Sequence, residues 1–85
     1  MPWSILWTDR ALRDMSRLDP TVARRILKKV EEAATNPRRF FVRLVASDEH
    51  KLRIGDYRLF AAIDSASKSI LVERVDHRSR IYERR

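Results

Sequence analysis

The sequence has no cysteine, a single glycine and no long apolar run. Without cysteine, disulfides and thiolate-bound metal sites are excluded. No apolar stretch approaches the roughly 18 residues that span a bilayer, so no membrane partner is expected. The N-terminus lacks the basic start and apolar core of a secretory signal, and we therefore expect a cytoplasmic protein. A content of 44% apolar residues with one glycine predicts a single folded domain over residues 1–85.

Positive charge is what the sequence has in excess. Lysine and arginine total 19 against 12 acidic residues, a net charge of +7, and 15 of those 19 are arginine. A small basic domain favours polyanions or an acidic protein as partners. The planar arginine fork binds phosphate and carboxylate better than the point charge of lysine does. A merely solvated, arginine-rich surface explains the composition equally well. The charge therefore indicates which partners are plausible, but it does not indicate a reaction.

The first half of the chain predicts a strand followed by two helices. Bulky and small residues alternate over 3–7, which is typical of a short strand. Thr8 is suited to cap a helix whose apolar residues follow helical spacing. Asp19-Pro20 predicts a second helix, with a capping carboxylate followed by proline at the first helical position. Asn36-Pro37 ends it, because the residue before proline is pushed out of the helical region.

The second half alternates with period two, and we predict strands over 40–46, 50–54, 57–63 and 69–75. Gly55-Asp56 is a two-residue hairpin turn that requires positive φ at the glycine. The final residues are compatible with one or two helical turns. This order predicts an α+β domain: an N-terminal strand and two-helix hairpin packed on one face of a mostly antiparallel sheet of four or five strands, with a short C-terminal helical tail.

The predicted hairpin has a consequence for chemistry. Leu52 and Leu59 must point toward the helices, so strict alternation makes Lys51, Arg53 and Arg58 project from the uncovered face. Any sheet covered on one side carries charge on its wet side. We expect no carboxylate among these three cations, and that favours a functional surface over a merely solvated one.

Two segments together resemble a known family. KLRIGDYRLFAAID (residues 51–64) and VDHRSRIYER (residues 75–84) are similar to the RelE branch of the RelE/ParE toxin superfamily. The upstream strand and helices also match that family's layout, so the likeness covers nearly the whole chain. It implies a ribosome-dependent endoribonuclease that enters the decoding A site and cuts messenger RNA there. The 2′-hydroxyl attacks the adjacent phosphate, and neither a metal nor another cofactor is expected.

The resemblance also implies roles for individual residues. Lys51 matches a phosphate-contacting lysine, and Arg58 matches the cation that steadies the cleaved phosphate. Arg53 matches a nearby basic position with a less defined role. Arg78 matches the arginine linked to departure of the leaving group, and Tyr82 matches the terminal tyrosine proposed to take the 2′ proton.

Several assignments stay open at this point. Family members often carry a lysine where this chain has Glu49, and its loss weakens transition-state stabilisation unless another arginine substitutes. His77 rivals Tyr82 for proton transfer, because histidine is the usual acid–base side chain near neutral pH. His50 falls on the core side of its strand and is interpreted as structural. Four further cations are candidate RNA contacts, although cations on a helix are more often only solubilising: Lys28, Lys29, Arg43 and Arg80.

A toxin of this family implies a cognate antitoxin. We expect an acidic, partly disordered, RelB-like chain encoded beside this one, which folds onto the basic surface. The alternative function is that of a ParE-like toxin, which shares the fold but inhibits DNA gyrase without cutting RNA. A nucleic-acid-binding module without activity is a third possibility. The set formed by Lys51, Arg53, Arg58, Arg78 and Tyr82 distinguishes them, since gyrase-directed relatives do not need it.

Overall fold

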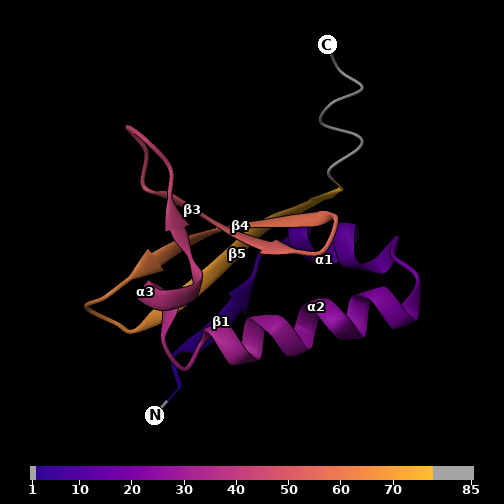
Figure 1. The fold of residues 1–85 in the computed structure, drawn as a ribbon, viewed down its shortest axis with the longest axis horizontal. Coiled ribbons are helices and arrows are strands. Elements are labelled where there is room, and N and C mark those ends of the chain that lie inside the picture. Colours follow the sequence, from indigo (N-terminus) through magenta and orange to yellow (C-terminus); the bar gives the residue numbers. More distant parts are fainter. Residues whose placement is uncertain (1, 78–85) are drawn as a thin grey trace.

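The chain forms a five-stranded sheet with helices on one of its faces (Figure 1), in a computed structural model that describes residues 2–77. The strand order is β1-β5-β4-β3-β2. β1 runs parallel to β5, and all other neighbouring strands are antiparallel. The elements are, in chain order, β1 (Ser4–Trp7), α1 (Asp9–Ser16), α2 (Pro20–Ala33), α3 (Pro37–Phe40), β2 (Val42–Arg43), β3 (Glu49–Ile54), β4 (Tyr57–Asp64) and β5 (Ser69–His77). The predicted α+β class and the mostly antiparallel sheet are confirmed.

Local sequence explains where the helices begin. Thr8 caps α1, since its Oγ1 accepts a hydrogen bond from the Ala11 N–H at 3.0 Å. The same hydroxyl donates to the Glu73 carbonyl of β5 at 2.9 Å, which ties the helix start to the sheet. α2 begins at Pro20 as predicted, but the Asp19 side chain makes no capping hydrogen bond. The fixed φ of proline therefore marks this start, and the expected carboxylate cap is wrong.

The core lies between α2 and the central strands. Ile26 and Val30 of α2 are fully buried against Leu59 of β4 and Ile70 of β5. Because Leu59 is turned into this core, its neighbours Arg58 and Phe60 on β4 must point to the other side of the sheet. Burial of the apolar face is what fixes the orientation of every charged side chain in the central hairpin.

The predicted strand over residues 40–46 is wrong in extent. Pro37 starts a single helical turn, α3, which includes Phe40, and β2 has only two residues. Pro37 favours the first helical position, and this position overrides the alternation that follows it. Ala46 then adopts a positive φ of 56° where the chain turns toward β3. The outer edge of β3 is consequently paired with β2 only through His50 and Lys51.

β4 and β5 contain a bulge that shifts the alternation of β5. Phe60 is opposite Arg74, but Ala61 is opposite Val72, so Glu73 is the extra residue. Val72 and Val75 are both buried although they are three positions apart. The bulge thus turns Arg74 to the uncovered side. β5 also continues to His77, two residues beyond the predicted end.

Candidate functional site

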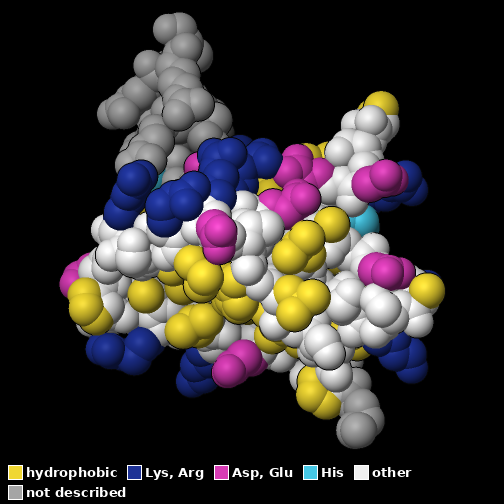
Figure 2. Space-filling view, turned by 180° about the vertical axis from the view of Figure 1, so that it is seen from behind, with side chains coloured by type: hydrophobic (Ala, Val, Ile, Leu, Met, Phe, Trp, Pro, Cys, Tyr) yellow, Lys and Arg dark blue, Asp and Glu magenta, His cyan; other side chains and the backbone are white. Residues whose placement is uncertain are grey.

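The sheet surface turned away from α1 and α2, here called the open face, carries two rows of side chains across β3, β4 and β5. One row consists of Lys51, Phe60 and Arg74, which are opposite one another in register. The next row consists of Arg53, Arg58 and Asp76. Figure 2 shows Lys and Arg side chains gathered along the upper part of the molecule, with acidic side chains beside them. The register brings the three predicted hairpin cations together on one surface.

Arg74 occupies the middle of the open face, and sequence reasoning missed it. Its Nη1 donates to the Glu49 carboxylate, and its Nε donates to Asp76 Oδ2 at 3.4 Å. The guanidinium carbon lies 3.9 Å from the centre of the Phe60 ring. Plain alternation along β5 puts Arg74 on the same side as Val72, so only a prediction of the bulge would have found it.

Two carboxylates therefore lie on the open face, and the expectation of a face without them is wrong. Glu49 precedes Lys51 by two residues, so alternation already placed it there, and its side chain is 22% exposed. Asp76 reaches the same side only because the bulge shifts β5. Both carboxylates pair with Arg74. Glu49 acts here as an anchor for an arginine from another strand.

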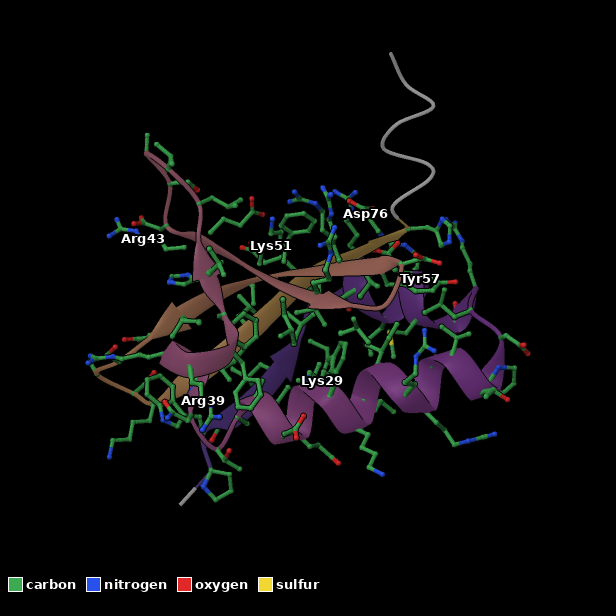
Figure 3. All side chains as sticks on the ribbon, viewed as in Figure 1. Lys29, Arg39, Arg43, Lys51, Tyr57 and Asp76 are labelled. Atoms are coloured by element: carbon green, nitrogen blue, oxygen red, sulfur yellow. The ribbon has the colours of Figure 1, made fainter. Side chains whose placement is uncertain are left out.

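His77 faces the helices instead of the open face. It is opposite Tyr57, and the two rings meet edge to face with centroids 4.8 Å apart. Together with Asp14, Arg17 and Leu18 they line a small cleft beside α1. In Figure 3, Asp76 lies above the strands, and Tyr57 lies at the turn end of the β3–β4 hairpin. The structure thus does not bring His77 together with the hairpin cations.

The remaining predicted residues within the described range lie at the periphery. Lys29 pairs with Glu32 at 3.0 Å and lies 5.1 Å from the Phe40 ring centre. Lys28 lines a groove between α2 and the outer edge of β3, to which Arg53 also contributes. Arg43 of β2 pairs with Asp48 at 3.6 Å, and both side chains are exposed. His50 is half-buried, with Nδ1 3.1 Å from the Asp48 carbonyl oxygen. Arg78, Arg80, Tyr82 and the predicted helical tail lie outside the described residues.

The open face is suited to hold an anion. Arg53 is exposed, while Lys51 and Arg58 are half-buried, which is typical of basic side chains whose stems pack on a sheet, and the Nε of Arg58 is buried. Preorganised cations of this kind stabilise charge that develops on a phosphate during its displacement. Within residues 2–77, no group of three or more His, Asp or Glu side chains could hold a metal ion. No helix in the same range is both long and apolar enough to cross a membrane.

Comparison with known proteins agrees with this fold. Residues 5–82 match the family model of the ParE toxin of the type II toxin–antitoxin system parDE. Toxin RelG of Mycobacterium tuberculosis is 35% identical over 91 residues, covering 99% of this chain and all of that protein. The RelBE2 toxin–antitoxin complex of the same organism contains a chain with a TM-score of 0.82 and 27% identity, covering 92% of this chain and 100% of that one. A mutant of Escherichia coli toxin RelE in the free state gives a TM-score of 0.77 at 25% identity, covering 98% of this chain and 93% of that one. The chain therefore belongs to the RelE/ParE superfamily, the toxins of type II toxin–antitoxin systems.

Proposed function

We propose that this toxin is a ribosome-dependent endoribonuclease that cuts messenger RNA in the ribosomal A site. The observation that carries the proposal is the gathering of Lys51, Arg53 and Arg58 on one open face by the register of β3 and β4. In the reaction, the 2′-hydroxyl attacks the adjacent phosphorus, the bond to the 5′ oxygen breaks, and a cyclic phosphate and a 5′-hydroxyl end are formed. The cations stabilise the phosphorane, which carries more negative charge than the substrate.

The individual roles follow position on the open face. Arg58 lies in the central strand between Arg53 and Asp76, so it is assigned to the scissile phosphate. Lys51 lies one row away and is assigned to a neighbouring phosphate. Arg78 and Tyr82 keep the roles that the family resemblance gives them, at the leaving group and the 2′ proton. Because His77 faces α1, its placement supports Tyr82 as the base.

The ribosome has a specific part in this proposal. Arginine holds its proton too tightly to be an efficient general acid, and a site of arginines with one tyrosine has weak proton transfer. We attribute the missing rate to the ribosome, which holds the messenger with the 2′ oxygen in line for attack. The purified toxin is accordingly expected to cut free RNA far more slowly than translated RNA. Lys28, Lys29, Arg43 and Arg80 are assigned to peripheral RNA contacts.

An acidic antitoxin is the proposed partner, and the cytoplasm the proposed site of action. The structures of similar toxins include complexes with RelB antitoxins. Because the net charge of the toxin is +7, an acidic chain is complementary to it and is expected to associate quickly. Such a chain neutralises the toxin if it covers the open face. Its gene is expected beside that of the toxin.

Induced expression followed by mapping of messenger ends tests the proposal. New 5′ ends are expected within translated frames, and a block of translation initiation should remove them. Arg58→Ala should reduce their number about 10²–10³-fold, the usual effect of losing one transition-state donor. Arg13→Ala, an exposed arginine on α1, serves as the matched control and should cut like the wild type. Absence of new ends with the wild-type toxin would overturn the proposal.

Inhibition of DNA gyrase is the second candidate function, and the match to the ParE family model favours it. Its test is a supercoiling assay with the purified toxin. Inhibition of supercoiling that Arg58→Ala leaves intact, without cleavage of messenger, would identify this function. The open-face cations favour the ribonuclease, because binding gyrase does not require cations gathered around one phosphate.

A further inference from the structure

We propose that Arg74, stacked on Phe60, is a platform on which one base of the bound RNA stacks. This inference deepens the proposed ribonuclease function by naming the part of the RNA that the centre of the open face receives. Arg74 lies outside both segments that carry the family resemblance, residues 51–64 and 75–84.

The carboxylates beside Arg74 disfavour an anionic ligand at its edge, so its flat surface is the part best suited to an uncharged group. Nη1 and Nε both donate to carboxylates, Glu49 and Asp76, so two negative charges flank the guanidinium. A phosphate would be repelled by these carboxylates and would compete with them for the donors. An uncharged base meets no such penalty, and RNA-binding proteins stack bases on guanidinium planes as well as on aromatic rings.

The plane of Arg74 is also held in place before any ligand arrives. One side rests on Phe60, which is only 6% exposed, at 3.9 Å. Two ion pairs fix its edge, and 28% of the side chain remains exposed. Because Phe60 covers one side of the guanidinium, a stacking base would approach from the opposite side. A side chain fixed in this way loses little conformational entropy when a ligand stacks on it.

The phosphate cations lie within reach of the same nucleotide. The row of Arg74 and the row of Arg58 are neighbouring same-face positions, about 7 Å apart along the strands. A nucleotide can therefore place its phosphate near Arg58 while its base lies on Arg74. Stacking does not depend on the hydrogen-bonding groups of a base, so this contact is expected to bind any of the four bases.

Binding of a non-cleavable RNA to the full chain tests the platform without any cleavage. The probe is a 2′-O-methyl RNA trinucleotide, compared with the same molecule lacking its central base. The wild type is expected to bind the intact probe about 5- to 140-fold more tightly, the usual range for one stacked base. Arg74→Lys keeps the charge but lacks the plane, so it should bring this ratio close to one. Arg53→Ala should weaken binding of both probes equally and leave the ratio unchanged.

A second measurement does not depend on how the variants fold. In the wild-type protein, the NMR signal of the Arg74 Nε–H should move upfield with the intact probe, because a base stacked on the guanidinium adds its ring current. The abasic probe should not produce this shift. Three results would overturn the platform. The wild type could bind both probes with equal affinity, a folded Arg74→Lys protein could keep the wild-type ratio of affinities, or both probes could produce the same NMR shift. Failure to cut messenger in cells rejects the ribonuclease proposal and leaves this binding measurement unaffected.

Discussion

Replacing Arg53 by threonine is expected to stabilise the domain while it weakens the action on RNA. Arg53 is exposed and lies directly opposite Arg58 in the β3–β4 hairpin. It also lines the groove that receives Arg25 and Lys28 from α2. Like charges directly opposite each other in a sheet are destabilising. At the Cβ spacing of directly opposite residues, roughly 5.5 Å, two unit charges in water would repel by about 0.8 kcal/mol, and cross-strand pairs contribute about 0.2–1 kcal/mol.

The expected gain in the free energy of unfolding is therefore about 0.2–1 kcal/mol, which raises the Tm by about 1–8 °C in a domain of this size. Thermal and urea unfolding of the purified protein measure it. The gain should shrink at about 1 M salt, where the screening length falls to about 3 Å from about 10 Å at 0.1 M.

Arg43→Thr is the matched control. Arg43 is also an exposed strand arginine, but it pairs with Asp48 at 3.6 Å and donates to the Ser47 carbonyl at 3.0 Å. The same substitution there loses favourable contacts and should cost about 0–1 kcal/mol. A loss of stability in Arg53→Thr, or a gain that is unchanged by salt, would refute the reasoning that the hairpin cations repel one another.

Three further predictions concern the scaffold and are all read from unfolding curves. Thr8→Val removes the helix cap and the hydrogen bond to β5, so it should lower the free energy of unfolding by about 2 kcal/mol. Thr8→Ser keeps the hydroxyl and should retain most of the stability. Gly55→Ala should lower the free energy of unfolding by about 1–2 kcal/mol, because φ at this position is +58°. The new Cβ would also approach the Arg25 guanidinium, but that flexible side chain can move away. Hydrogen bonds from the Ser67 hydroxyl and the Ala66 N–H lower the pKa of Asp64. Its folded-state pKa thus lies below the unfolded value, so wild type should be more stable than Asp64→Ala above about pH 4, and this difference should narrow as the pH falls further.

The pattern within single strands determined much of the candidate site. In β3 and β4, apolar side chains alternate with charged ones, and only one arrangement buries Leu52 and Leu59. That requirement alone placed Lys51, Arg53 and Arg58 on the open face. Gly55 likewise determined the hairpin turn, since its positive φ allows a connection of two residues. These predictions depend on residues close together in the chain, where the periodicity of the backbone is sufficient.

Only the tertiary structure decided how β5 completes the open face. The bulge at Glu73 arises from pairing with β4, and no local signal in the sequence of β5 reveals the shift that turns Arg74 outward. The pair formed by Glu49 and Arg74 joins residues 25 positions apart. Local alternation gives the direction of a side chain relative to its own strand, whereas the partner it meets depends on strand pairing across the whole sheet. For that reason the sequence by itself determined the cations of the hairpin, and the assembled sheet decided which carboxylates and which arginine lie among them.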